Sequence, residues 1–364
     1  MQAADAPLLV TEQPTANGCV LGSLTLNVEA SLNSLTLEMI RAMNVALTNW
    51  RSREDLAAIV LTGRGPKAFC AGGDIQALYR SCVANQQAGS EVDDYARCFF
   101  TEEYQLDLLM HEYPKPIMTL GHGVVMGGGF GLLSASRFRV LTERSRLAFP
   151  EITIGLFPDA GGSWVLKQLP LAVAAFLGLT GSQLNARDAL SLGIGSHVID
   201  HEVRDSVLPQ LAELSWQAGS NEANASLLEE FLATLHQPPC QLPTELDVLT
   251  EWAVQVDDLA STAKALFALQ GQSDWIDRGL DNLRKGCPTT AAIVLEQLRR
   301  VQTMTLTESF AMERAIAIRC AQLPDFAEGV RALLIDKDGR ADWQYKALGE
   351  VPRAHVLSHF AATL

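Results

Sequence analysis

Residues 57–74 read AAIVLTGRGPKAFCAGGD, and residues 116–131 repeat the same form with PIMTLGHGVVMGGGFG. In each stretch a short apolar run, at 57–62 and 117–120, predicts a buried strand. A glycine-rich turn follows each run and is expected to open a helix. The two stretches therefore predict an α/β fold in which strands lead into helices.

Glycines in such turns let the main chain approach a ligand closely, because they carry no side chain. N–H groups at a helix start carry partial positive charge, so two that converge on one point would form an oxyanion hole. Tight packing of strand against helix is the alternative reason for either turn. Neither turn matches a dinucleotide fingerprint or a P-loop, and residues 123–127 lack the serine of a nucleophile elbow.

The preceding part of the chain continues this organisation. Strands are predicted at residues 8–11 and 19–28 around an Asn17-Gly18 turn, which is a strong hairpin signal. Apolar side chains at helical spacing between residues 40 and 50 predict an amphipathic helix.

Composition excludes several classes of protein. The chain has 364 residues, of which 48% are hydrophobic and 19% charged, as in a folded globular protein. Its net charge of -14 repels nucleic acid and anionic membrane surfaces, so neither partner is expected. The seven cysteines are odd in number and form no C-x-x-C pair, and the seven histidines form no ligand cluster. Reduced thiols and no metal site are therefore expected.

Two further features bear on location. The first forty residues contain no Lys or Arg, which predicts neither a signal peptide nor a transit peptide, so a cytoplasmic location is expected. Residues 116–136 carry no formal charge and are long enough to cross a bilayer. Their glycines and His122 favour a strand, a turn and a buried helix start instead.

The segment PEITIGLFPDAGG (residues 150–162) places two carboxylates in otherwise apolar sequence. A carboxylate in an apolar pocket has its pKa raised towards working pH, and it can then serve as acid, base or nucleophile. Glu151 and Asp159 are therefore candidate catalytic residues. Each of them, taken alone, is explained equally well as a helix cap or a solvent-facing side chain.

Three motifs in this order and spacing resemble those of the crotonase (enoyl-CoA hydratase/isomerase) superfamily. They are AFCAGGD (68–74), MGGG (126–129) and the segment 150–162. The resemblance continues in DNLRK (281–285) and EGVRALLIDKD (328–338), so it covers nearly the whole chain. It implies a core of repeated ββα units wound into a spiral.

After about residue 203 the sequence pattern becomes typical of helices. Thr305 and Glu308 have the spacing of a capping box before one of these helices. Together with the resemblance, this predicts a crotonase-like α/β core over residues 1–225. A helical C-terminal region over residues 226–364 is expected to cover the active site.

The resemblance implies roles for five positions. The backbone N–H groups of Gly73 and Gly128 would bind the thioester carbonyl oxygen. Hydratases of the superfamily carry two catalytic glutamates, and Gly131 occupies the position of the first, whereas Glu151 retains the second. Asp159 stands where hydratases have a small residue and the superfamily's hydrolases have aspartate. The resemblance therefore favours hydrolysis over hydration.

Further substrate-binding positions follow from the same resemblance. Glu103 matches a substrate-site glutamate of the hydrolases, although an exposed helix face is an equal alternative. The coenzyme A moiety is expected near Lys67, Ala68 and Ala71. Lys337 and Arg331 are further candidates for its phosphates, but ion pairing with Asp336 and Asp338 explains these side chains better.

The implied activity is hydrolysis of a short-chain 3-hydroxyacyl-CoA thioester, with 3-hydroxyisobutyryl-CoA of valine breakdown as the expected substrate. Glu151 would act as nucleophile or as general base for water, and Asp159 would orient the 3-hydroxyl or the water. Coenzyme A enters as part of the substrate, and no other cofactor is expected. The alternatives are an enoyl-CoA hydratase or isomerase, and a non-catalytic acyl-CoA-binding protein. A homo-oligomer is expected from the family.

Overall fold

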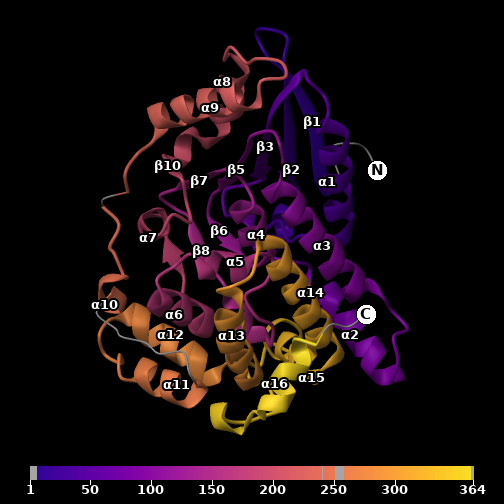
Figure 1. Cartoon of the computed structure of the whole chain (residues 1–364), viewed down its shortest axis with the longest axis vertical. Helices are drawn as coiled ribbons and strands as arrows, with labels where there is room; N and C mark the ends of the chain where they lie inside the picture. Colours follow the sequence, from indigo (N-terminus) through magenta and orange to yellow (C-terminus); the bar gives the residue numbers. More distant parts are fainter. Residues whose placement is uncertain (1–5, 240, 251–257, 362–364) are drawn as a thin grey trace. The chain divides into compact units, whose positions relative to one another are not determined.

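The structure is a computed structural model that describes residues 6–239, 241–250 and 258–361 (Figure 1). The chain divides into two compact units, each built from three segments. Unit 1 comprises Met1–Gly73, Gln105–Leu147 and Leu184–Pro243, and unit 2 comprises Asp74–Tyr104, Ala148–Gln183 and Thr244–Leu364. These units interleave along the chain, unlike the single boundary predicted at residue 225. The predicted covering of the active site by residues 226–364 stays a prediction.

Unit 1 contains a six-stranded sheet. Its strands are β1 (Leu8–Pro14), β2 (Val20–Leu26), β3 (Leu56–Gly63), β5 (Ile117–Gly121), β7 (Phe138–Thr142) and β10 (His197–Ile199). They lie in the order β1-β2-β3-β5-β7-β10, with β1 antiparallel to β2 and all other neighbours parallel. The predicted hairpin and both predicted buried strands are confirmed.

The helices of unit 1 flank this sheet. They are η2 (Glu29–Ser31), α1 (Leu37–Trp50), α4 (Gly128–Ser134), α7 (Ala186–Ser191), η4 (His201–Ser206), α8 (Val207–Ala212) and α9 (Asn221–Leu235). The predicted amphipathic helix is α1, and its N-terminal N–H groups are capped by the Thr36 hydroxyl. Apolar side chains of α8, α9 and the central strands form one core that includes the buried Trp216.

A second, four-stranded sheet also belongs to this part of the chain. It consists of β4 (Ala68–Cys70), β6 (Val124–Met126), β8 (Arg146–Ala148) and β9 (Leu184–Asn185), in the order β4-β6-β8-β9. The sequence predicts only glycine-rich turns at residues 68–74 and 121–131. Each turn instead contains a short strand, and β4 pairs with β6 in parallel.

The uncharged stretch 116–136 therefore folds as two strands and a helix. Among the residues that the structure describes, no helix is long and apolar enough to cross a membrane.

The two glycine-rich turns are packed against each other within unit 1. A Cβ on Gly72 would lie 3.4 Å from the carbonyl oxygen of Met126. A Cβ on Gly129 would overlap the carbonyl oxygen of Cys70 and lie 2.6 Å from the Cβ of that residue. Glycine at 129 is thus required by the approach of β4 to α4.

Replacing Gly129 by alanine is expected to destabilise the protein by about 1–3 kcal/mol, because the added methyl forces the two turns apart. Urea unfolding of the purified variant measures this change. Gly349→Ala is the matched control, since nothing lies within 4 Å of a Cβ at that position, and it should change stability by less than about 0.5 kcal/mol. Equal midpoints for the two variants would contradict the close packing described.

Unit 2 is almost entirely helical. Its N-terminal and middle elements are α2 (Ile75–Ala88), α3 (Tyr95–His111, which ends in unit 1), η3 (Pro150–Ile154), α5 (Gly162–Lys167) and α6 (Leu171–Thr180). The C-terminal elements are α10 (Asp247–Thr250), α11 (Leu259–Phe267), α12 (Asp274–Lys285), α13 (Pro288–Val301), α14 (Leu306–Gln322), α15 (Pro324–Val330), the π-helical turn η5 (Arg331–Ile335), η6 (Leu348–Glu350) and α16 (Arg353–His359). The helices predicted for the C-terminal region are confirmed, and so is the capping box of Thr305 and Glu308.

No disulfide links the cysteines that the structure describes, which are Cys19, Cys70, Cys82, Cys98, Cys287 and Cys320. Cys240 lies outside the described residues. The expectation of reduced thiols therefore holds for the six cysteines that the structure describes.

Candidate active site

The predicted oxyanion-hole glycines both lie in unit 1. Gly73 follows β4 and forms a bridge with Leu35, while Gly128 follows β6 as the first residue of α4. Because β4 and β6 run parallel, the glycine-rich segments leave the same edge of the sheet. The N–H of Gly128 is one of the first in its helix, and such groups have no acceptor within the helix.

The residues predicted to hold the coenzyme lie in β4 or directly beside it. Ala68 is buried in β4, and the exposed Lys67 precedes it. The carbonyl oxygen of Lys67 accepts the N–H of Val124, which joins the starts of β4 and β6. Ala71 donates its N–H to the carbonyl of Leu32 at 3.1 Å. The Lys67 side chain is thus the accessible cation of this group, and a coenzyme-binding role for it stays a prediction.

The carboxylate of Glu151 is buried in η3 of unit 2, with 3% of the residue exposed. Its Oε2 atom has no hydrogen-bond partner among the described residues. Burial raises the pKa of Glu151 well above its usual value, and the neighbouring Asp159 carboxylate raises it further. The alternative of a solvent-facing side chain is excluded.

Asp159 is also buried, and its Oδ2 accepts a hydrogen bond of 2.5 Å from the hydroxyl of Tyr104 on α3. Burial raises the pKa of Asp159 to about 6, although the Tyr104 hydrogen bond acts in the opposite direction. Burial also raises the pKa of Tyr104 well above its usual value, and the Asp159 carboxylate adds to this effect. The tyrosine therefore stays protonated as the donor.

Glu103 is 2% exposed, next to Tyr104 on α3. The alternative interpretation of this residue as part of an exposed helix face is therefore wrong. Its role towards substrate stays a prediction.

Three residues around the Asp159 turn were missed at the level of sequence: Tyr104, Gln297 and Glu313. Each is buried, and each donates to or accepts from residues 158–163. A signal for Glu313 was present, because this glutamate lies in the apolar stripe of α14, three residues after Phe310 and seven before Cys320. No comparable pattern marks Tyr104, which lies between Glu103 and Gln105 in α3.

The guanidinium of Arg331 is engaged by acidic neighbours. It pairs with Glu328 at 2.8 Å, Asp336 at 2.5 Å and Asp338 at 2.9 Å. Ion pairing, the interpretation favoured from the sequence, is confirmed for this side chain.

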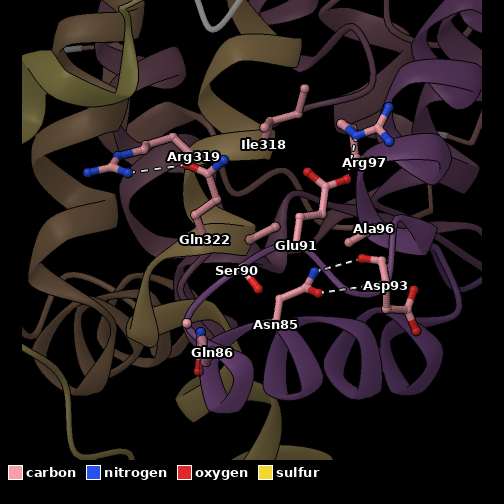
Figure 2. Close-up of a pocket in the computed structure, with 12 residues that line it drawn as sticks. Asn85, Gln86, Ser90, Glu91, Asp93, Ala96, Arg97, Ile318, Arg319 and Gln322 are labelled. Atoms are coloured by element: carbon pink, nitrogen blue, oxygen red, sulfur yellow. Dashed lines mark hydrogen bonds and ion pairs between the residues drawn. The ribbon is translucent and has the colours of Figure 1, made fainter.

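A pocket of about 490 Å³ lies between α2, the start of α3 and the end of α14, all within unit 2 (Figure 2). It contains none of the site residues predicted from the sequence. Figure 2 shows Arg97 bonded to Glu91 and Asn85 bonded to Asp93 along its wall. Arg97 and Asn85 thus bond other residues of the wall, and we assign the pocket no role in the reaction.

Comparisons with known proteins agree on the family. The sequence matches the enoyl-CoA hydratase/isomerase family over residues 21–360. Proteins of Bos taurus and Homo sapiens, both named 3-hydroxyisobutyryl-CoA hydrolase, mitochondrial, are 36% identical over 348 and 347 residues; each match covers 94% of this chain and 86% of the relative. A solved structure of a carnitinyl-CoA dehydratase from Mycobacterium thermoresistibile has a TM-score of 0.83 at 28% identity, covering 99% of this chain and 97% of that one.

These relatives correct one expectation. Both hydrolases are named as mitochondrial proteins, so the prediction of a cytoplasmic location is wrong. The prediction rested on reduced cysteines and on the charge of the first forty residues. Neither property identifies one reducing compartment among several.

Proposed function

The chain belongs to the enoyl-CoA hydratase/isomerase family, and from this membership we propose that it hydrolyses 3-hydroxyisobutyryl-CoA to 3-hydroxyisobutyrate and coenzyme A. The observation that best supports hydrolysis is that Glu151 and Asp159 are both buried, while position 131 holds a glycine. Relatives named 3-hydroxyisobutyryl-CoA hydrolase, matching 94% of the chain, support the same substrate. The reaction belongs to valine breakdown.

The proposed chemistry uses the ionised carboxylate of Glu151 at the thioester carbonyl carbon. In one route Glu151 attacks this carbon, coenzyme A leaves as the thiolate, and water hydrolyses the resulting acyl anhydride. In the other route Glu151 takes a proton from water, whose oxygen attacks the carbon and expels the thiolate. Either route consumes one water and breaks one C–S bond. One proton of that water ends on the coenzyme A thiolate and the other is released with the product carboxylate, so Glu151 is again ionised. Both require Glu151 to lose its proton, and a carboxylate stripped of water is the more reactive base.

The remaining residues stabilise charge and orient the substrate. The N–H groups of Gly73 and Gly128 are assigned to the carbonyl oxygen as it becomes an oxyanion, each contributing about 10²–10³ in rate. Asp159, held by the Tyr104 hydroxyl, is assigned to the substrate's 3-hydroxyl or to the attacking water. Lys67 is assigned to the coenzyme phosphates, with Ala68, Ala71 and Glu103 lining the bound substrate. No metal or further cofactor enters this scheme.

The proposal is tested by offering the purified protein 3-hydroxyisobutyryl-CoA and crotonyl-CoA in parallel. Free thiol is followed with a colour reagent, and the enoyl double bond by its absorbance. We expect thiol release from the hydroxyacyl thioester and no loss of enoyl absorbance. Loss of absorbance without thiol release would make the protein a hydratase, and coenzyme binding with neither signal would make it a non-catalytic binding protein.

The pH dependence follows from the carboxylate pair. Because the reactive forms are ionised and burial raises both pKa values, Asp159 to about 6, we expect kcat/KM to rise with pH through an apparent pKa near or above 6. Initial rates of thiol release between pH 5 and pH 9 measure this. A profile that stays flat down to pH 5 would mean that neither carboxylate has to ionise.

Association into a homo-oligomer is part of the proposal because it is expected from the family. Light scattering during gel filtration measures the mass of the particle.

A further inference from the structure

The turn that carries Asp159, residues 158–163, is held by side chains from two C-terminal helices of unit 2. Glu313 of α14 accepts the N–H groups of Gly161 and Ser163, each at 2.8 Å, one on each carboxylate oxygen. Gln297 of α13 donates its amide to the carbonyl of Pro158 and to the Ser163 hydroxyl, both at 2.6 Å. The turn is therefore bonded on both sides of Asp159.

The backbone of this turn is in an unfavourable conformation at Ala160. Ala160 has φ +50° and Gly161 has φ +83°, so two successive residues lie in the left-handed region. For alanine this region is disfavoured by contacts of its Cβ. One bond within the turn, from the Gly162 N–H to the Asp159 carbonyl at 2.7 Å, closes it, and the Glu313 carboxylate adds the two bonds from Gly161 and Ser163.

Burying Glu313 is costly unless these bonds are made. The residue is fully buried, and burial raises the pKa of Glu313 to about 7, whereas the bonds from Ser163 and Gly161 lower it. An apolar side chain would fill the same place in the stripe of α14 without this cost. The carboxylate is thus committed to the turn rather than to the packing of its helix.

We propose that Glu313 is a positioning residue for the hydrolysis. It fixes the 158–163 turn so that the Asp159 carboxylate keeps its hydrogen bond from the Tyr104 hydroxyl and its orientation towards the substrate. The inference rests on the proposed function for its effect on rate. Its effect on the turn itself does not depend on that function. The ring centroids of Phe310, one turn before Glu313, and Tyr104 are 6.3 Å apart, so α14 contacts both Tyr104 and the turn that carries Asp159.

The main test is Glu313→Gln, assayed by thiol release from 3-hydroxyisobutyryl-CoA. The amide keeps the size of the carboxylate but offers one acceptor oxygen where two N–H groups need one each. If the turn is displaced, the Asp159 carboxylate loses its orientation towards the substrate. We therefore expect kcat to fall about 10- to 100-fold, with KM changed less than about 2-fold. Gln297→Met, which releases the same turn from α13, should lower kcat in the same direction and keeps the test open if Glu313→Gln does not fold.

Two controls on the same helix separate positioning from stability. Glu308→Gln makes the same chemical change at an exposed residue of α14 and should leave kcat unchanged. Thr305→Ala removes the N-cap of α14 and lowers the melting temperature without touching the turn. If Thr305→Ala lowers kcat as much as Glu313→Gln does, or if Glu313→Gln keeps wild-type kcat, the inference is wrong.

Amide hydrogen exchange gives a readout that needs no activity. We expect the amides of Gly161 and Ser163 to exchange faster in Glu313→Gln than in the wild type, and to be unchanged in Glu308→Gln. If the wild type releases no thiol, the proposed function fails, and unchanged exchange in Glu313→Gln would separately overturn the positioning role. Thiol release by the wild type with unaltered kcat in the variant would overturn the inference alone.

Discussion

Glu151→Gln lowers kcat for thiol release from 3-hydroxyisobutyryl-CoA by about 10³-fold or more, the largest effect we expect from a single substitution. Glutamine has nearly the shape of glutamate, but its amide can neither attack the thioester carbon nor accept a proton from water. Both proposed routes therefore stop at their first step. The residual rate reflects substrate binding and the Gly73 and Gly128 donors alone.

The loss in Glu151→Gln should appear without loss of fold. Burial raises the pKa of Glu151, so the ionised side chain is unfavourable inside the protein, and a neutral amide should be tolerated at least as well. Thermal unfolding and far-ultraviolet circular dichroism check this, with Glu230→Gln at an exposed residue of α9 as the control. A variant that retains more than a tenth of wild-type kcat would show that Glu151 is neither nucleophile nor base.

The two routes are separated by single-turnover hydrolysis in ¹⁸O-labelled water. An anhydride at Glu151 leads to label in the enzyme carboxylate when water attacks on the protein side, and hydroxylamine should trap the acyl group. A general base leaves the label only in the product. Mass spectrometry of the peptide that contains Glu151 reads the outcome.

Asp159→Asn is expected to lower kcat by about 10²–10³-fold and, at pH 8, to make the protein more stable. The rate falls because an amide cannot hold the substrate hydroxyl or the water as a carboxylate does. Stability rises because the variant no longer has a buried carboxylate to ionise. The amide oxygen can still accept the Tyr104 hydroxyl.

The sign of this change in stability follows from the pKa of Asp159, which burial raises from 3.8 to about 6. The folded state therefore binds the proton of Asp159 more tightly than the unfolded state does. This difference contributes its whole amount to the free energy of unfolding below about pH 4, and the contribution is lost as the pH rises through about 6. The shift corresponds to at most about 3 kcal/mol. Because the buried amide must also satisfy its NH₂ group, we expect a net gain of about 1–2 kcal/mol at pH 8 and none at pH 4.

Urea unfolding at the two pH values measures this difference. Tyr104→Phe is the informative comparison, because it keeps the carboxylate and removes its donor. That variant should be less stable than the wild type at pH 8, opposite in sign to Asp159→Asn. If Asp159→Asn is destabilised equally at pH 4 and pH 8, the carboxylate does not titrate between them, and the burial argument fails.

Much of this protein was predictable from local pattern. The hairpin, the helix from Leu37 to Trp50 and the buried strands follow from periodicity and turn residues, since these depend on neighbours in the chain. Glu151 and Asp159 were found because carboxylates in an apolar segment are unusual, and because the motifs around them resemble those of one superfamily. The short strands inside the glycine-rich turns were missed, because three residues carry no periodicity of their own.

The sequence alone identified the side chains that have the chemistry for the proposed reaction, and it identified the family whose fold brings such side chains together. Only the tertiary structure decided their surroundings: the bond from Tyr104 to Asp159, the burial of Glu103, and the clamp of Glu313 and Gln297 on the 158–163 turn. Tyr104 and Glu313 lie far from Asp159 along the chain and reach it through the packing of α3 and α14. A carboxylate's pKa depends on that packing, because the free energy of its charge is set by the water, donors and carboxylates around it.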